Sequence, residues 1–196
     1  MSANILRLGA LLLALAIAGC GMPQPGLKNT DVTGTDCCRD FRLTDQNGKT
    51  RTLADFRGKV VVMFFGYTQC PDVCPTTLTE LKSVMQQLGA DAKRVQVLFV
   101  TLDPERDTPA LLAQYVPAFD PSFLGLYGNA DVTAKTAKEF RVFYQKQPGP
   151  TPGSYTLDHT AGSYVFDPSG RVRLFVRYGD SAANLVADLR TLLRQG

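Results

Sequence analysis

The sequence contains no cluster of lysine and arginine residues, although 21 of its 196 residues are basic. They are nearly balanced by 18 aspartates and glutamates, and they do not alternate with aromatic residues as on a nucleic-acid-binding surface. We therefore expect no nucleic-acid partner. Internal repeats are also absent. The length suits one domain, and the apolar content of 44% is sufficient for a substantial core.

The N-terminal apolar segment, from Ile5 to Gly19, is too short for a permanent membrane span. A helix of about 15 residues extends about 22 Å, whereas the hydrocarbon core of a bilayer is about 30 Å thick. We therefore predict a signal peptide at residues 1–19. It ends in Ile17-Ala18-Gly19-Cys20, which resembles a bacterial lipobox, so we expect cleavage before Cys20 and lipid on its sulfur. An ordinary signal peptide and an uncleaved anchor are the alternatives.

The stretch after Cys20 contains prolines and glycines and few large apolar side chains. Residues 20–36 are therefore predicted to be a tether between the membrane and a domain at residues 37–196. A lipid-anchored domain of this kind would face the bacterial periplasm. That space is oxidising, so cysteine pairs in it can form disulfides.

Strand and helix patterns alternate through the domain, which predicts an α/β fold with a mixed, mostly parallel central sheet and helices on both faces. Thr77 and Glu80 are expected to form a capping box in the first helix, and residues 147–153 a loop. The predicted elements are an N-terminal β-hairpin at 41–53, a strand at 60–65, a helix containing 78–88, a strand at 95–102, a helix from 109, a strand at 123–127, a helix from 131, a hairpin at 163–178 and a helix containing 185–193. This order resembles the thioredoxin fold.

Two of the five cysteines, Cys70 and Cys74, lie where a buried strand meets a helix. Backbone N–H groups and the helix dipole lower thiol pKa values at a helix N-terminus. If the turn is helical, the spacing of four places the two side chains on neighbouring positions. The pair could therefore bind a soft metal ion or form a redox-active disulfide. A static disulfide and two buried free thiols are the alternatives.

The sequence has one histidine, His159, which follows the loop rich in proline and glycine. That loop could bring the imidazole to the two cysteines, and Asp158 could orient the ring by a hydrogen bond. Two thiolates and one imidazole suit copper better than magnesium or calcium. Structural zinc would require a fourth protein ligand, for which Cys37 or Cys38 could supply the sulfur.

Three stretches resemble the signature of the Sco/SenC family, and the similarity runs from about Phe41 to the last helix. They are Gly66-Tyr67-Thr68-Gln69-Cys70-Pro71-Asp72-Val73-Cys74-Pro75-Thr76-Thr77, Val100-Thr101-Leu102-Asp103-Pro104-Glu105-Arg106-Asp107-Thr108-Pro109, and Asp158-His159. The resemblance implies a thioredoxin-like fold, membrane tethering, and copper, as Cu(I) or Cu(II), bound by Cys70, Cys74 and His159.

The resemblance also implies a function in the assembly of cytochrome c oxidase. The favoured one is a metallochaperone that delivers copper to the dinuclear copper site of the oxidase. Its partners would be the copper-bearing oxidase subunit or another periplasmic copper carrier. The alternative is a thiol–disulfide oxidoreductase that uses Cys70 and Cys74 to keep the oxidase cysteines reduced. A peroxidase is less favoured, because attack on peroxide does not require a second cysteine at this spacing.

The adjacent residues Cys37 and Cys38 depart from the family pattern, which often has a Gly-Gly-Pro-Phe-like run before the first strand. Adjacent cysteines can form only a strained eight-membered disulfide ring, so a simple structural bridge is not expected. We expect them to be reduced or incidental residues. The alternative is an additional metal or redox site that belongs to this protein.

Overall fold

The computed structural model describes residues 26–195. The predicted signal peptide, the predicted lipidation site Cys20 and the start of the predicted tether lie outside these residues. In the described part of the chain, none of the helices combines the length and the apolar character needed to cross a bilayer.

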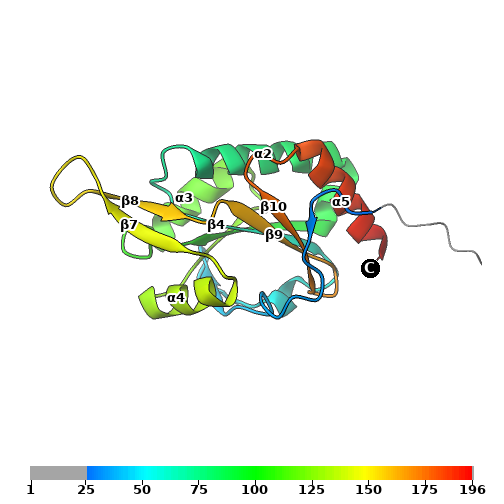
Figure 1. The fold of residues 1–196 in the computed structure, drawn as a ribbon, viewed down its shortest axis with the longest axis horizontal. Coiled ribbons are helices and arrows are strands. Elements are labelled where there is room, and N and C mark those ends of the chain that lie inside the picture. Colours follow the sequence, from blue (N-terminus) through cyan, green and yellow to red (C-terminus); the bar gives the residue numbers. More distant parts are fainter. Residues whose placement is uncertain (1–25, 196) are drawn as a thin grey trace, which may run out of the picture.

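An eight-stranded mixed sheet forms the centre of the fold, in the order β1-β10-β9-β4-β5-β6-β2-β3 (Figure 1). β4 pairs in parallel with β5, and β5 with β6, whereas the pairs on either side are antiparallel. A mixed sheet is therefore confirmed, but a mostly parallel one is wrong, because hairpins add antiparallel strands at both edges. The strands are β1 (Thr30–Asp31), β2 (Leu43–Asp45), β3 (Thr50–Arg51), β4 (Val60–Gly66), β5 (Val95–Thr101), β6 (Leu124–Tyr127), β9 (Gly162–Phe166) and β10 (Val172–Arg177).

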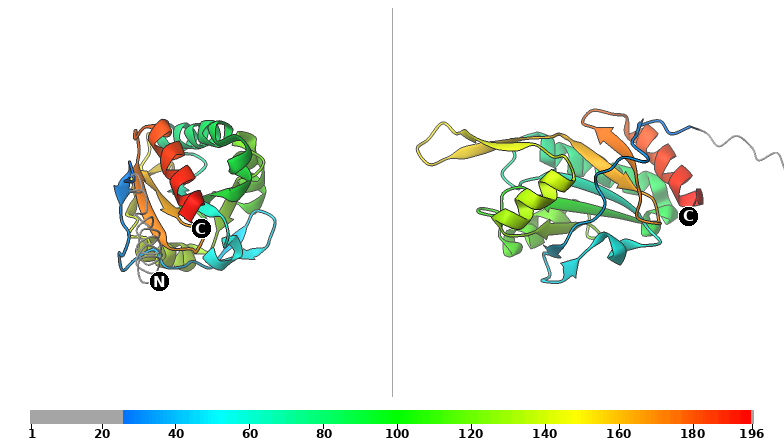
Figure 2. Two further views of the ribbon diagram at one scale, coloured as in Figure 1. Left: turned by 90° about the vertical axis from the view of Figure 1, so that its right-hand side faces the viewer. Right: turned by 60° about the horizontal axis from the view of Figure 1, so that its bottom comes forward.

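Helices cover both faces of the sheet, as predicted (Figures 1 and 2). Three of them, α2, α3 and α5, lie on one face, and α4 lies on the other. The N-terminal hairpin is also confirmed, since β2 and β3 pair antiparallel. The helices are α2 (Val73–Leu88), α3 (Pro109–Phe119), α4 (Ala130–Glu139) and α5 (Ala182–Gln195), with short 3₁₀ helices η2 (Leu53–Phe56) and η3 (Gly89–Arg94).

The core lies on both sides of β4, whose residues are all buried. Neighbouring side chains of a strand point to opposite faces, so this strand supplies two hydrophobic layers. Phe64 packs against Phe99, which in turn contacts Tyr115 of α3. Phe65 packs on the other face against Phe140, directly after α4, with ring centroids 5.3 Å apart. The unbroken apolar run of this strand is explained by burial on both faces.

Helix α2 begins earlier than the sequence suggests. Its first residue is Val73 and Asp72 occupies the N-cap position. Thr77 and Glu80 therefore lie inside the helix, and the predicted capping box is wrong. Pro75 fits the first turn, because a proline there removes an N–H group that has no partner within the helix. This early start places Cys74 in the first turn.

A second, two-stranded sheet flanks the loop predicted for residues 147–153. β7 (Tyr144–Pro148) and β8 (Tyr155–His159) pair antiparallel, with Tyr144 opposite His159. The predicted loop forms the tip of this hairpin, which projects from the end of the main sheet (Figure 1). His159 is thus the last residue of a strand at the base of the hairpin.

The described residues that precede Cys37 already contact the domain. β1 pairs with β10, and the backbone N–H groups of Lys28 and Asn29 each donate to the carboxylate of Asp188 at 2.8 Å. The side chain of Asn29 donates to the same carboxylate. The last part of the predicted tether, from Lys28 on, therefore lies against the domain.

Candidate metal centre

Cys70 lies in the loop between β4 and α2, where the free backbone N–H groups of the helix begin. Its own N–H donates to the carbonyl oxygen of Tyr67 at 3.2 Å, which closes a tight turn. The backbone N–H of Cys74 donates to the sulfur of Cys70 at 3.4 Å. This arrangement stabilises a thiolate on Cys70, because helix N-termini favour negative charge.

Cys74 is fully buried, and its sulfur belongs to the hydrophobic core. A Cβ atom on Gly66 would lie 2.7 Å from this sulfur and 3.0 Å from the ring of Phe64. Only glycine at position 66 lets the end of β4 approach the sulfur so closely. The end of β4 therefore packs directly against the sulfur of Cys74 and restricts its position.

His159 is held so that one ring nitrogen is free to bind a metal. Its Nδ1 lies 3.1 Å from the carbonyl oxygen of Thr160, and its Nε2 lies 3.6 Å from the sulfur of Cys74. A carbonyl oxygen only accepts, so a neutral imidazole in this contact carries its proton on Nδ1. The lone pair of Nε2 then points toward the cysteine. This is the tautomer that metal ligation requires.

The three predicted ligands form one cluster. Their sulfur and nitrogen atoms all lie within 4.8 Å of one another. Cys70 and His159 also line an open groove, with Pro71 and Asp158 at its sides, so a ligand from another molecule can reach them. Two sulfurs and one imidazole nitrogen form a donor set that suits copper and is unsuited to magnesium or calcium.

Hydrogen bonding splits the pKa values of the two thiols. The pKa of Cys70 is lowered to about 4, chiefly because the thiol of Cys74 stabilises its thiolate, helped by backbone N–H groups at the start of α2, against the opposing effect of burial. The pKa of Cys74 is raised, because its thiol donates to the Cys70 thiolate and because it is buried. One proton is thus shared by the reduced pair at neutral pH. Binding of a metal by both sulfurs must release that proton.

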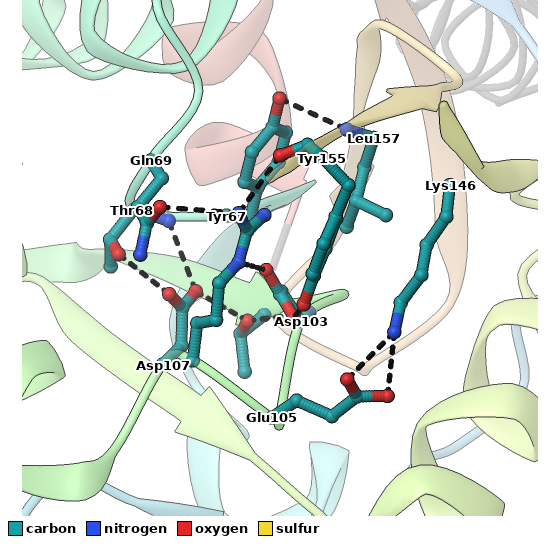
Figure 3. Close-up of polar contacts among 11 residues, drawn as sticks. Tyr67, Thr68, Gln69, Asp103, Glu105, Asp107, Lys146, Tyr155 and Leu157 are labelled. Atoms are coloured by element: carbon teal, nitrogen blue, oxygen red, sulfur yellow. Dashed lines mark hydrogen bonds and ion pairs between the residues drawn. The ribbon is translucent and has the colours of Figure 1, made fainter. Parts of the chain in front are cut away.

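Tyr67 connects the cysteine loop to the hairpin that carries His159. The side chain is buried, and its hydroxyl oxygen accepts a hydrogen bond from the backbone N–H of Leu157 at 3.1 Å (Figure 3). The ring also meets the imidazole edge to face, with centroids 6.0 Å apart. The position of β8 relative to the cysteines therefore depends on this tyrosine.

Arg106, in the loop between β5 and α3, forms a second connection. Its guanidinium donates to the carbonyl oxygen of Tyr155 at 2.9 Å and to the side chain of Gln69 at 3.2 Å. It stacks on the ring of Tyr155 at 3.5 Å and forms an ion pair with the buried Asp103. The hydroxyl of Tyr155 donates to the same aspartate at 2.8 Å (Figure 3). One side chain thus links the hairpin, the cysteine loop and the end of β5.

Asp107 holds the other end of the cysteine loop. Its buried carboxylate accepts hydrogen bonds from the N–H of Thr68 at 3.0 Å and from the hydroxyls of Thr68 and Thr101, each at 2.6 Å (Figure 3). Burial raises the pKa of this carboxyl group, although the three donors oppose that effect. Its position fixes the loop directly before Cys70.

The structure brings together Cys70, Cys74 and His159, as the sequence predicts, and leaves Asp158 outside. Asp158 is exposed and accepts a hydrogen bond from Gln147 at 2.8 Å. The carbonyl oxygen of Thr160 takes the role that was predicted for this carboxylate. Cys70 and Cys74 are free thiols here.

Sequence reasoning missed four contributors to the site, namely Tyr67, Arg106, Asp107 and Thr160. The first three lie inside the quoted family stretches, which are the only signal that could have found them. A backbone carbonyl such as that of Thr160 has no signature in a sequence.

Comparison with known proteins identifies relatives along most of the chain. The family model described as SCO1/SenC matches residues 30–194. The SCO2 homolog, a mitochondrial protein of Bos taurus, is 41% identical over 164 residues, which are 79% of this chain and 62% of that protein. The chain therefore spans less than two thirds of the length of this curated relative.

Two solved structures with bound copper share the fold. ScoI of Bradyrhizobium japonicum is 44% identical, with a TM-score of 0.71 over 77% of this chain and 96% of that one. Yeast Sco1 is 32% identical, with a TM-score of 0.72 over 80% of this chain and 88% of that one. The predicted thioredoxin-like α/β fold is therefore confirmed.

Proposed function

The chain belongs to the SCO1/SenC family, and we propose that it is a copper carrier that delivers the ion during the assembly of cytochrome c oxidase. The ion is held by Cys70, Cys74 and His159. One observation carries this proposal: two sulfurs and an imidazole nitrogen with a free lone pair lie within 4.8 Å of one another. The copper-containing structures of ScoI and yeast Sco1 support it.

The geometry explains how the site would accept either oxidation state of copper. Cu(I) prefers soft thiolate ligands, and an imidazole nitrogen is a good ligand for Cu(II). The thiolate of Cys70 is present at neutral pH, so it is available as the first ligand. Cys74 becomes a ligand when copper displaces its proton. His159 completes the site without rearrangement of the ring, because Thr160 already fixes the tautomer.

The acceptor that we propose is the dinuclear copper site of the oxidase subunit, or another periplasmic carrier. The open groove beside Cys70 and His159 supports transfer between proteins, because an acceptor ligand can approach the ion from solvent. We also propose that residues 1–19 are a signal peptide, that Cys20 carries the lipid, and that the part of residues 20–36 before Lys28 tethers the domain at the periplasmic face of a membrane, since the rest packs on the domain. The short apolar segment and the small residues before Cys20 support this arrangement.

Titration of the reduced, full-length protein with Cu(I) against a competing chelator tests the carrier. We expect one copper ion per chain, and loss of tight binding in Cys70→Ser and in Cys74→Ser. Cys37→Ser is the matched control, since it also removes one thiol, and it should bind like the unmodified protein. Unchanged stoichiometry and affinity in the two serine variants at the site would overturn the proposal.

Transfer is tested separately with the metal-free, reduced copper-bearing subunit of an oxidase. We expect the loaded protein to supply copper to that subunit faster than the same concentration of copper–chelator complex does. A protein that binds copper tightly but does not transfer it would be a store and not a carrier.

A second candidate is a thiol–disulfide oxidoreductase that reduces the oxidase cysteines. It is favoured by the hydrogen bond from the N–H of Cys74 to the sulfur of Cys70, which stabilises an attacking thiolate. The reduction potential of the Cys70–Cys74 pair decides this candidate, because a pair more oxidising than the partner disulfide cannot reduce it. The two functions are compatible, since copper binding also requires both thiols to be reduced.

A further inference from the structure

A second pair of thiols lies outside the copper site. The sulfurs of Cys37 and Cys38 are 3.0 Å apart, and both residues are free cysteines. A disulfide bond is about 2.05 Å long, so these are two thiols in close contact. Among the described residues, no histidine or carboxylate completes a three-ligand set with them, whereas Cys70, Cys74 and His159 do form such a set. The surroundings therefore favour sulfur chemistry over metal binding.

The chain holds Cys38 rigidly and leaves Cys37 accessible. Cys38 is buried and has a φ of 61°, a left-handed conformation that is rare for residues with side chains. Its N–H donates to the carbonyl oxygen of Glu139, and the N–H of Arg39 donates to the side chain of the same residue, so the end of α4 maintains this backbone. Cys37 is partly exposed, and its thiol donates to the hydroxyl of Thr35.

The open hollow beside this pair is positively charged. Residues 33–35 and 37–39 form one wall, and residues 170–173, from the turn before β10 and its first two positions, form the other. Asp36 does not line the hollow and pairs with Arg141. The charged side chains of its lining are Arg39, Arg171 and Arg173, and in the described part of the chain the lining contains no acidic residue. Two of these arginines pair with the buried Asp167 behind the turn, whereas Arg39 is exposed. A ligand with carboxylate groups fits this hollow.

We propose that Cys37 and Cys38 form a second thiol site that exchanges with disulfides flanked by carboxylates, of which oxidised glutathione is the simplest. The sulfur of Cys37 attacks one sulfur of the substrate R–S–S–R, and the first R–S⁻ leaves. The sulfur of Cys38 then attacks the sulfur of Cys37, and the second R–S⁻ leaves. The two protons of the cysteines pass to the two leaving thiolates. Two protein thiols are oxidised to one disulfide, and the substrate disulfide is reduced to two thiols.

The order of attack follows from burial. Cys37 is the sulfur that a substrate can reach, and burial raises the pKa of the Cys38 thiol, so Cys38 keeps its proton until its neighbour has reacted. The disulfide between adjacent residues closes a strained ring, and strained disulfides are readily reduced again. The pair therefore rests as a dithiol, and its oxidation is reversible.

The test uses the full-length chain with Cys20, Cys70 and Cys74 replaced by serine, which leaves Cys37 and Cys38 as its thiols. With oxidised glutathione, we expect release of two equivalents of glutathione per chain and a protein mass lower by two hydrogen atoms, with no adduct. Adding Cys38→Ser should stop the reaction at one adduct on Cys37. A stable adduct in the parent protein, or no reaction at all, would overturn the proposal.

If Cys38→Ser does not fold, a second variant still tests the proposal. In the same background, Cys37→Ser should release no glutathione over the same period, with circular dichroism to verify the fold. An equally fast reaction in this variant would contradict the role of Cys37 as the attacking sulfur.

The charge of the hollow is tested by comparing the rates at which the protein reacts with oxidised glutathione and with the neutral bis(2-hydroxyethyl) disulfide. Each rate is divided by the rate of the same disulfide with a free small-molecule thiol, which corrects for its intrinsic reactivity. We expect a several-fold preference for glutathione at low salt, which Arg39→Gln should reduce and the exposed control Lys93→Gln should not. A peptide disulfide flanked by glutamates distinguishes a protein substrate from a small molecule, and both agree with the proposal. Equal relative rates for charged and neutral disulfides would overturn the assigned substrate class.

Discussion

Cys70 and Cys74 are separated by three residues and belong to the start of α2, whereas Cys37 and Cys38 are adjacent and precede β2. The sulfur of Cys74 lies 3.6 Å from the imidazole of His159. The sulfur of Cys38 lies 3.0 Å from that of its own neighbour, and no imidazole is near it in the described structure. Both pairs combine one buried cysteine with one that is partly exposed.

The difference shows that cysteine content does not determine the chemistry of a site. At the start of α2, backbone N–H groups stabilise a thiolate and a third ligand faces the pair, so the arrangement suits a metal ion. At Cys37 and Cys38 the nearest reactive atom for each sulfur is the other sulfur, so the arrangement suits a two-electron exchange. Each of the following predictions tests one part of this contrast.

The largest effect is expected when the imidazole is removed. His159→Ala should weaken Cu(II) binding by about 100-fold or more, because loss of a direct ligand exceeds the 10- to 100-fold effect of losing its supporting hydrogen bond. Asp158→Asn is the matched control, since this neighbour is exposed and bonded to Gln147, and it should stay within about twofold of the parent. Competition titration followed by copper absorption measures both. Equal Cu(II) affinities in the two variants would show that His159 is not a copper ligand.

The second prediction concerns pH. The pKa of Cys70 is lowered to about 4, so its thiolate persists as the pH falls from 9 and is lost only near pH 4. Its alkylation rate should change less than about twofold between pH 8 and pH 6, whereas an ordinary thiol slows by roughly 100-fold. Mass spectrometry of the metal-free, reduced protein measures the rate at each cysteine. A tenfold loss per pH unit at Cys70 would show that α2 does not stabilise this thiolate.

A smaller effect is expected from the connection between the hairpin and the cysteine loop. Arg106→Gln removes the hydrogen bond to the carbonyl oxygen of Tyr155 and leaves Asp103 buried without its ion pair. We expect an about tenfold weaker Cu(II) affinity and a loss of about 1–3 kcal/mol in the free energy of unfolding.

The control for that variant is Lys146→Gln on the same hairpin, which breaks an exposed ion pair with Glu105 of the β5–α3 loop and a contact with the Tyr155 ring at 4.4 Å. Exposed pairs contribute about 0–1 kcal/mol, so its effect should be small. Hydrogen exchange at the N–H of Leu157 should accelerate in Arg106→Gln and not in the control. Unchanged exchange in Arg106→Gln would mean that Tyr67 alone holds the hairpin.

The smallest effect is expected from the second thiol pair. Replacing both Cys37 and Cys38 by serine should leave the copper stoichiometry at one per chain and the affinity within about twofold, because neither sulfur belongs to the three-ligand cluster. Copper titration of the reduced protein measures both quantities. Loss of part of the bound copper would show that the two pairs cooperate in metal binding.

The position of the two copper-site cysteines was predictable because it depends on local patterns. A fully apolar strand followed by an amphipathic helix predicts a strand-to-helix junction, and Cys70 and Cys74 lie at that junction. His159 was predictable because the chain offers no other imidazole. The fold class followed from the alternation of strands and helices.

Other parts of the site depend on tertiary contacts that leave no local pattern. The strand β7 is mostly polar and exposed, so it lacks the alternation of a half-buried strand and was not predicted from the sequence. The role of Asp158 was wrong because alternate residues of β8 point to opposite sides, which turns this carboxylate away from the imidazole of the next residue. The carbonyl of Thr160 and the stacking of Arg106 on Tyr155 become visible only in three dimensions.

The separate two-stranded sheet has a kinetic consequence for the proposed copper carrier. β7 and β8 pair with each other and not with the main sheet, so His159 lies on a unit that can open locally at a smaller free-energy cost than global unfolding. Such an opening withdraws one ligand, while both sulfurs remain on the main body of the domain. A ligand of the acceptor can then take the place of the imidazole before either thiolate dissociates. In the proposed carrier, the ion would then be handed over by stepwise ligand exchange, without passing through a free aqueous state.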